Sequence, residues 1–305
     1  MWNFVGRRYW WFGLSLLIIV PGMLTLILFG LPLAIDFTGG SLLDIRFDGA
    51  APQSADVTAV YTQFGFGDAQ IQSIESNGLQ IRTKAMEDAE KNQIEATLRD
   101  KFGPFTELEF GTVSAAIGSE VVQRAAQTVA IAAIGIMLYL WFAFRQVPHA
   151  FRYGVAAVIA MLHDVLVMVG LAAIFGKVFG WEVDSLYLTA LLTVIGFSVH
   201  DTIVVFDRIR ENLIRRRGER FDLVVNHSIM QTLDRSINTT LTVLFTLLAL
   251  VLFGGITIRH FVLILLVGIT SGAYSSIFNA AQILVVWEFR EWRTWFRRKP
   301  RTATA

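Results

Sequence analysis

The sequence contains no cysteine and has few charged residues. Without cysteine the chain has neither disulfide bonds nor thiolate metal ligands, and its redox compartment stays undecided. Charged residues make up 17% of the chain and hydrophobic residues 54%, whereas a typical soluble domain has about 25% charged residues. The net charge of +1 gives no excess that would indicate a nucleic-acid partner. This composition is typical of a membrane protein.

The motifs of common enzyme classes are also missing. The sequence has no P-loop, no nucleophile elbow and no cluster with metal-ligand spacing. We therefore expect no metal, no cofactor and no catalytic site, and we favour a transport function over an enzymatic one.

Long apolar runs account for most of the chain. A membrane-spanning helix needs about 20 mostly apolar residues. Six windows meet that length: 10–35, 125–144, 153–176, 185–206, 236–258 and 261–287. The first run, uncharged from Tyr9 to Ile35, is longer than the apolar core of a signal peptide and lacks a small-residue cleavage site. We therefore interpret it as a retained span of a polytopic helical bundle.

The distribution of arginine and lysine predicts the orientation in the membrane. Cytoplasmic loops of membrane proteins carry an excess of these residues. Basic residues gather before the first span, after the second, fourth and sixth spans, and are sparse in the other short loops, which hold only Lys177 and Arg259. We therefore expect both termini and the loop 207–235 in the cytoplasm. The tryptophans expected at the two interfaces are Trp10, Trp11, Trp181, Trp287, Trp292 and Trp295.

The segment between the first two spans has soluble character. Alternating and helical periodicity predict strands at 41–49, 69–74, 78–84 and 106–113, and helices at 54–65 and 86–103. Ser54 is the expected N-cap of the first helix, and residues 75–78 are the expected turn. The order β-α-β-β-α-β is ferredoxin-like. This external domain would serve packing and docking or would contact a moving substrate directly, because the fold hosts many functions.

The fold class is therefore an α-helical polytopic membrane protein with six spans and one α+β domain outside the cytoplasm. The expected divisions are 1–35 (cytoplasmic N-terminus and first span), 36–122 (external domain), 123–290 (the other five spans) and 291–305 (basic cytoplasmic tail).

Two of the expected spans each contain a His-Asp pair. His163 and Asp164 lie in the third span, and His200 and Asp201 lie in the fourth. A charge near the bilayer centre costs from about 3 to over 10 kcal/mol, so such residues usually face the bundle interior and serve an ion or substrate path. For both histidines, a structural hydrogen bond and proton transfer stay open as alternatives.

Arg235, at the start of the fifth span, is the expected partner of Asp201. Burial favours the protonated acid, whereas a nearby guanidinium favours the carboxylate. A movement that separates the two side chains would therefore make Asp201 take up a proton, and their approach would release it. The alternative is a permanent ion pair, although burying an ion pair rarely repays its desolvation cost.

Small and hydroxyl residues at helical spacing form stripes along the last three spans, and such stripes are typical of close helix packing. The stripes are Thr189, Thr193, Gly196 and His200; Arg235, Thr239, Thr242 and Thr246; and Gly268, Gly272, Ser275, Asn279 and Gln282.

Five segments resemble the SecF-type members of the SecD/SecF family, which belongs to the RND superfamily and serves bacterial protein export. They are DFTGGS (36–41), VSAAIGSEV (113–121), HDTIVVFDRIREN (200–212), LDRSINTTLT (233–242) and GAYSSIFNAAQ (272–282). The third segment is the most specific, whereas the first also suits SecD. Ser41 departs from the threonine that is common in the family. The resemblance covers nearly the whole chain.

The resemblance implies that a SecD subunit supplies six further spans and that the pair joins the SecYEG channel, with SecA acting indirectly and YajC as a further partner. Together they would use the proton-motive force to draw unfolded preproteins across a bacterial inner membrane. The family's proton-path acid falls on Asp201 and its basic partner on Arg235, with His200, Asp164 and His163 as further candidates. Asp36, Gly39 and Gly40 would form the joint between the first span and the external domain, as a hinge or as a plain tight turn.

Two other functions stay open. An RND-like exporter of small molecules or lipids would use the same acids, although such pumps usually carry both halves in one longer chain. A non-transporting assembly factor that steadies the channel would not need Asp201 to change its protonation. The charged end of the fourth span, Asp207 to Glu211, would meet anionic lipid headgroups or dock a partner.

Overall fold

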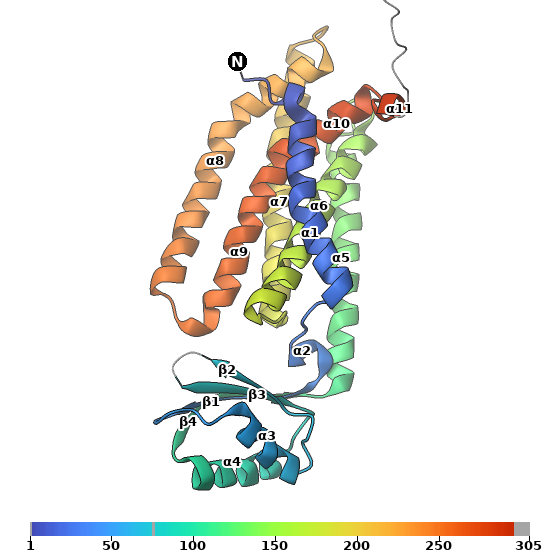
Figure 1. Ribbon diagram of the computed structural model, residues 1–305. Helices are drawn as coiled ribbons and strands as arrows, with labels where there is room; N and C mark the ends of the chain where they lie inside the picture. The colour runs from blue at the N-terminus through green and yellow to red at the C-terminus, as the bar shows by residue number, and fades with distance from the viewer. Residues whose placement is uncertain (1, 75–76, 296–305) are drawn as a thin grey trace, which may run out of the picture. The chain divides into compact units, whose positions relative to one another are not determined.

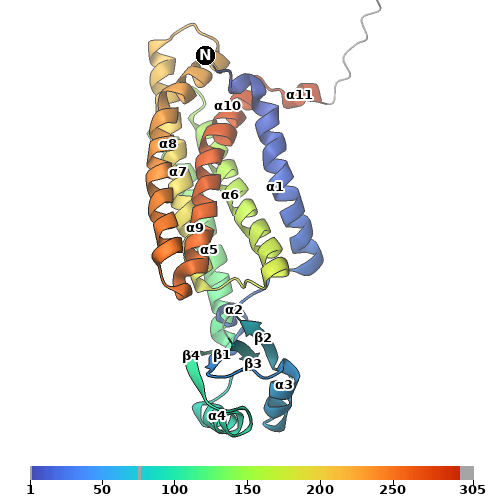
Figure 2. The same ribbon diagram turned by 60° about the vertical axis from the view of Figure 1, so that its left-hand side comes forward.

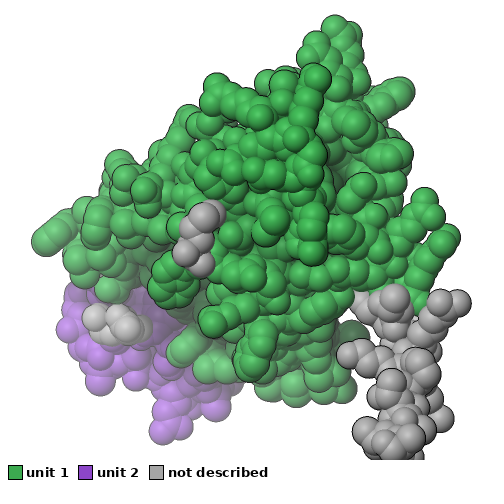
Figure 3. All heavy atoms as spheres, turned by 90° about the horizontal axis from the view of Figure 1, so that it is seen from above, with its two compact units in different colours: residues 1–32, 128–305 green, residues 33–127 purple. Residues whose placement is uncertain are grey.

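The computed structural model describes residues 2–74 and 77–295, leaving aside the side chains of residues 256, 257, 294 and 295. The chain divides into two compact units, which Figure 3 colours separately. Unit 1 comprises Met1–Pro32 and Thr128–Ala305 and is helical, whereas unit 2 comprises Leu33–Gln127 and contains a β-sheet.

Six helices of the described residues are long and apolar enough to cross a membrane (Figure 1). Their bounds are α1 Arg8–Phe29, α5 Ala115–Ala143, α6 Ala150–Phe179, α7 Ser185–Arg215 and α8 Phe221–Phe253, with the sixth formed by α9 Ile256–Ser275, the π-helical segment η2 Ser276–Ala280 and α10 Ala281–Glu288. A 3-10 turn, η1 Val5–Arg7, precedes α1, and the short helix α11 Trp292–Trp295 follows α10. The predicted six-span helical protein is confirmed.

Several helix bounds differ from the apolar windows in the sequence. α1 ends at Phe29 although the apolar run continues to Ile35, because Gly30 takes a φ of 75° and Pro32 follows. α7 continues to Arg215 and α8 begins at Phe221, so most of 207–235 is helical. Polar side chains hold these two helix ends together, as where Nδ2 of Asn212 donates to Oγ of Ser228 at 2.9 Å.

The core of unit 1 lies between α6, α7 and the sixth span. At one end of the bundle it includes a ring cluster in which Tyr153 stacks on Phe144 at 5.2 Å and meets Phe206 edge-on at 5.4 Å between ring centroids. The outer faces of α1 and α5 are apolar and exposed instead, with Leu17 and Ile131 each 70% exposed. Such surfaces are typical of helices that face lipid.

The basic end of the bundle, defined as the start of α1, the α5–α6 and α7–α8 turns and the end of α10, is tied together by polar contacts. Oδ1 of Asn226 accepts a hydrogen bond from the backbone N–H of Phe4 at 2.8 Å. Arg8 forms an ion pair with Glu291, and Arg152 forms one with Glu288. The N-terminal segment is therefore fixed to α8, and α1 is linked to the residues after α10.

Unit 2 has the predicted strand and helix order. Its elements are α2 Ile35–Thr38, β1 Gly40–Phe47, α3 Ser54–Gln63, β2 Gln70–Ile74, β3 Gly78–Thr83, α4 Asp88–Phe102 and β4 Phe105–Val113. The four strands form an antiparallel sheet in the order β2-β3-β1-β4, which is the ferredoxin-like arrangement. Apolar side chains of β1, β3, α3 and α4, among them Ile45, Leu79, Val57 and Ile94, form its core.

One prediction in this unit is wrong by one residue. Gln53, not Ser54, occupies the N-cap position of α3, because Gln53 keeps an extended backbone with ψ of 141° while Ser54 is already helical. Glu87 and Glu90 form a capping box at the start of α4, which fixes that helix start firmly. Of the predicted turn 75–78, residues 75 and 76 lie outside the described residues.

Candidate functional site

Asp164 lies midway along α6 and is completely buried. Its Oδ2 accepts hydrogen bonds from Oγ of Ser198 on α7 at 2.5 Å and from Oγ of Ser275 at the end of α9 at 2.6 Å. Its Oδ1 accepts a hydrogen bond from Oγ of Ser271 on α9 at 3.0 Å and lies 3.0 Å from Nδ1 of His163. One carboxyl group therefore joins three membrane-spanning helices through serine hydroxyls.

Glycines on α9 allow this close contact. A Cβ atom at Gly272 would lie 3.1 Å from Cβ of Ser198, and one at Gly268 would lie 2.4 Å from Val194. The predicted stripe on the sixth span is thus a packing surface against α7. Farther along the same stripe, Nδ2 of Asn279 donates to Oγ of Ser15 on α1 at 2.9 Å.

The π-helical segment η2 begins directly after Ser275. A π-helical turn inserts extra backbone into a helix and is frequent at functional sites. Within the described chain, the fully buried amide of Gln282, two residues beyond this segment, has no hydrogen-bond partner at either side-chain atom. The sixth span is therefore irregular at the point where it supplies two serines to Asp164.

Asp201 lies on α7, three residues after Ser198, and differs from Asp164 in its surroundings. It is half-buried, whereas the neighbouring His200 and the expected partner Arg235 are exposed. No ion pair shorter than 4.0 Å joins Asp201 and Arg235 in the described part of the chain, although the charge of Arg235 acts on Asp201 at longer range. The structure therefore brings Asp164, but not Asp201, into a closed polar cluster.

Two of the predicted polar stripes lie on the surface of this chain. On α7, Thr189, Thr193 and His200 are exposed, and α8 exposes Arg235 together with Thr239, Thr242 and Thr246. The two helices are neighbours (Figure 2). Polar side chains in membrane spans rarely face lipid, since they usually meet protein or a water-filled cavity. This polar face, defined by the exposed residues of the two stripes, therefore indicates a surface that another protein segment or water covers.

The predicted joint residues lie where unit 2 begins. Asp36 is in α2, and Gly39 and Gly40 follow with φ of 74° and 127°. A Cβ atom on Gly39 would lie 2.6 Å from Cα of Ala115, and one on Gly40 would lie 2.5 Å from the carbonyl oxygen of Thr83. Both glycines are therefore required by backbone conformation and by close packing.

Sequence reasoning identifies both aspartates but misses all three serines as partners of Asp164, since Ser275 is predicted only as part of a packing stripe. Spacing within α9 places Ser271 and Ser275 on one face, which is the signal that could have found the second serine. No group of three or more His, Cys, Asp or Glu side chains that could hold a metal ion occurs in residues 2–74 and 77–295.

Comparison with known proteins gives consistent matches. The family model described as protein export membrane protein SecD/SecF, C-terminal, matches residues 93–290, and the SecD/SecF GG motif matches residues 25–51. The chain is 51% identical to the protein translocase subunit SecF of Anaerolinea thermophila over all of both chains.

Longer proteins match as well. The protein translocase subunit SecDF of Bacillus subtilis is 35% identical over 95% of this chain and 38% of its own length. The crystal structure of SecDF from Thermus thermophilus, described as a translocon-associated membrane protein, has a TM-score of 0.81 and 32% identity over 95% of this chain and 39% of its own. The chain thus spans well under half of these two SecDF proteins.

Proposed function

Because the chain belongs to the SecD/SecF family of protein-export membrane proteins, we propose that it is the SecF half of a proton-driven machine that completes the export of unfolded preproteins. The proton-driven part of this proposal rests on two acids in the spanning helices α6 and α7. Asp164 is enclosed in a cluster of serines, and Asp201 lies at the edge of an exposed polar face. A carboxyl group inside a membrane span is costly and usually functional.

The partner half is a SecD subunit. The SecDF relatives are more than twice as long as their match to this chain, which supports a second half of similar construction. The polar face of α7 and α8 supports the same proposal, since it includes Arg235 and six other polar side chains of two spans that would otherwise meet lipid. Covering it with a helix of SecD would enclose Asp201 and Arg235 between the two halves.

Proton coupling in this proposal uses the separation of Asp201 from Arg235. With the two side chains apart, desolvation favours a protonated Asp201, and their approach favours the carboxylate and releases the proton. Opening these two states to opposite sides of the membrane would convert a proton gradient into movement. Each proton supplies about 2.3 kcal/mol per 100 mV of membrane potential.

Asp164 links this event to the rest of the bundle. Ser198 binds Asp164 and precedes Asp201 by less than one helical turn, so a rotation of α7 that moves Asp201 also strains the serine cluster. His163 and His200 are candidates for passing protons to the neighbouring acids.

The orientation follows the basic residues. With the basic end of the bundle in the cytoplasm, unit 2 would lie on the extracytoplasmic side of a bacterial inner membrane. This is the side on which exported polypeptide emerges from SecYEG. SecA would act on this complex indirectly, and YajC would be a further partner. Gly39 and Gly40 would serve as the joint at the start of unit 2, and no cofactor or catalytic step is required.

The test uses inverted membrane vesicles that contain the chain, SecD and SecYEG. Asp201→Asn is expected to abolish the part of preprotein export that depends on the proton gradient, while assembly of the complex is retained. Asp207→Asn is the matched control, because Asp207 lies on the same helix but is exposed and paired with Arg210 at 2.6 Å.

If Asp201→Asn vesicles retain gradient-dependent export, the acid is structural and a stabilising role in the channel complex becomes the better proposal. If the gradient instead drives uptake of small apolar molecules into the inverted vesicles and leaves preprotein export unchanged, an RND-like exporter takes its place.

A further inference from the structure

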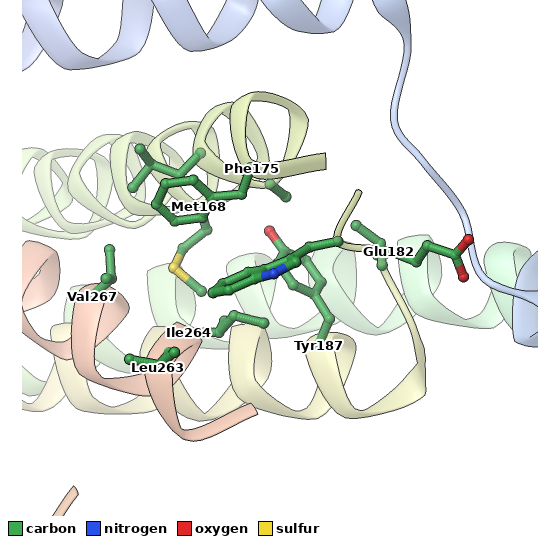
Figure 4. A pocket seen from close by; sticks show the side chains of 11 residues that line it. Met168, Phe175, Glu182, Tyr187, Leu263, Ile264 and Val267 are labelled. Atoms are coloured by element: carbon green, nitrogen blue, oxygen red, sulfur yellow. The ribbon is translucent and has the colours of Figure 1, made fainter. Parts of the chain in front are cut away.

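A cavity of about 150 Å³ lies between α6, α7 and α9 (Figure 4). It lies at the end of the bundle opposite the basic end, because the α6–α7 turn and the start of α7 line it. Its walls include Met168 and Phe175 from α6, Trp181 from the α6–α7 turn, and Leu263 and Val267 from α9. Apart from Glu182 at its edge and Tyr187, the lining side chains are hydrocarbon, thioether or aromatic. The carboxylate of Glu182 points away from the cavity (Figure 4).

Tyr187 supplies a side-chain oxygen that faces the cavity (Figure 4). Its side chain is only 5% exposed, and Figure 4 shows its hydroxyl directed across the cavity toward Met168 and Phe175. Within the described chain this hydroxyl has no hydrogen-bond partner. A buried hydroxyl without an acceptor is unfavourable, so its position indicates a ligand that carries an acceptor at this depth.

The depth of Tyr187 corresponds to the membrane interface. α6 ends at Phe179 and α7 begins at Ser185, so Tyr187 lies in the first turn of a spanning helix. Trp181 stacks on His260 with ring centroids 4.3 Å apart. Aromatic rings of this kind gather at the level of lipid headgroups, which is also where the ester carbonyls of glycerophospholipids lie. A carbonyl oxygen there is the acceptor that the Tyr187 hydroxyl requires.

A cation lies on the same helical face as the cavity wall. Arg259 is exposed and precedes Leu263 by four residues and Val267 by eight, so all three lie along one side of α9. At 1.5 Å per residue the distance from Arg259 to Val267 along the axis is about 12 Å. A phosphate at Arg259 would therefore leave an attached acyl chain positioned to run past Leu263 to Val267.

We propose that this cavity binds one acyl chain of an anionic glycerophospholipid from the surrounding bilayer. Tyr187 donates to the ester carbonyl of the lipid, Arg259 pairs with its phosphate, and the chain fills the space beside Met168 and Val267. Because α6, α7 and α9 also supply the ligands of Asp164, the bound lipid fixes the spacing of the three helices that form the serine cluster. The proposal does not depend on proton coupling.

The test is native mass spectrometry of the full chain, stripped of lipid in detergent and then titrated with phosphatidylglycerol or phosphatidylcholine of equal chain length. We expect one tightly retained phosphatidylglycerol per chain and weaker retention of phosphatidylcholine. Tyr187→Phe keeps the ring but removes the donor, and should weaken retention about three- to tenfold. Arg259→Gln should remove the preference for the anionic lipid.

Tyr139→Phe is the matched control, because Tyr139 is 57% exposed on α5 and lies outside the cavity. Val267→Trp fills the cavity with a larger side chain and should abolish the single tight site. If Val267→Trp misfolds, the test still rests on Tyr187→Phe, which keeps the aromatic ring. Equal retention by wild type, Tyr187→Phe and Arg259→Gln would overturn the proposal. So would displacement of the lipid by a stoichiometric free fatty acid, or loss of the site when SecD is present because a helix of SecD fills it.

Discussion

The hydroxyl oxygen of Ser198 on α7 lies 2.5 Å from Oδ2 of Asp164 on α6, at a fully buried point of the bundle. The same carboxyl oxygen receives Ser275 from the sixth span at 2.6 Å. The loss of any one donor would leave the buried carboxyl group with fewer hydrogen bonds, and an unsatisfied polar group is costly in a low-dielectric interior. The packing of α6, α7 and α9 is therefore coupled to the hydrogen bonding of Asp164.

Ser275→Ala is expected to destabilise the protein by about 1–3 kcal/mol, since a hydrogen bond to a carboxyl group is removed and its acceptor stays buried. Thermal unfolding of the purified chain in detergent measures the change. Ser276→Ala is the matched control, because Ser276 is also fully buried but its hydroxyl donates to the carbonyl oxygen of Ala273 in its own helix rather than to Asp164. Equal losses for the two variants would show that the tie to Asp164 adds no stability.

Gly40→Ala is expected to destabilise unit 2 by more than about 1 kcal/mol, because the residue has a φ of 127° and the new Cβ would meet the carbonyl oxygen of Thr83 at 2.5 Å. Limited proteolysis and thermal unfolding should both show earlier loss of this unit. Gly49→Ala serves as control, since a Cβ atom there has no neighbour within 4 Å. Unchanged stability of Gly40→Ala together with impaired export would instead indicate that the glycine acts as a hinge.

The sequence predicts much of this architecture because its signals are local. Apolar length predicts all six spans, and alternation predicts the four strands of unit 2, including β1 and β3 at the centre of the sheet. The end of α1 at Phe29 is missed because residues 31–34 are apolar without being helical. The early start of α8 is missed because polar residues such as Asp222 and Asn226 interrupt its first turns, and Asn226 is used to bind the distant N-terminal segment.

The candidate site is predicted only in part for the same reason. The cost of a buried charge identifies Asp164 and Asp201 from the sequence alone. Their surroundings depend on residues far along the chain: Ser198, Ser271 and Ser275 reach Asp164 only after three helices pack. The orphan hydroxyl of Tyr187 likewise has no local signature, since a tyrosine near a helix start reads as an ordinary interfacial residue.

Glu291 should make the basic end of the bundle sensitive to acid. Partial burial acts in the opposite direction, but hydrogen bonds from Arg8 and Tyr9 hold the pKa of Glu291 below its ordinary value of 4.5. A carboxyl group with a lowered pKa adds stability that is fully present above its ordinary value and is lost as the pH falls through the lowered one. Wild type should therefore unfold at a higher temperature than Glu291→Gln at neutral pH, and the gap should close below pH 4.5.

The control for this pH series is Glu120→Gln. Glu120 pairs with Arg124 on an exposed helix surface, with the two side chains 63% and 72% exposed, and such pairs add little stability. A difference in unfolding temperature between wild type and Glu291→Gln that does not depend on pH would show that the shape of the Glu291 side chain, not its charge, stabilises the protein.

The polar face of α7 and α8 predicts where the second half binds. Since the chain has no cysteine, single substitutions can be labelled without background. Thr193→Cys, on the exposed polar stripe of α7, should react with a membrane-permeant maleimide when the chain is made alone and should be protected when SecD is made with it. Leu138→Cys provides the comparison, because Leu138 is 50% exposed and lies on α5, a different helix from the polar stripes of α7 and α8. Its labelling should not change with SecD, since lipid already surrounds it. If SecD protects Leu138→Cys but not Thr193→Cys, the interface with SecD lies at α5 instead. The polar stripes of α7 and α8 would then line a water-filled path and would not bind the second half.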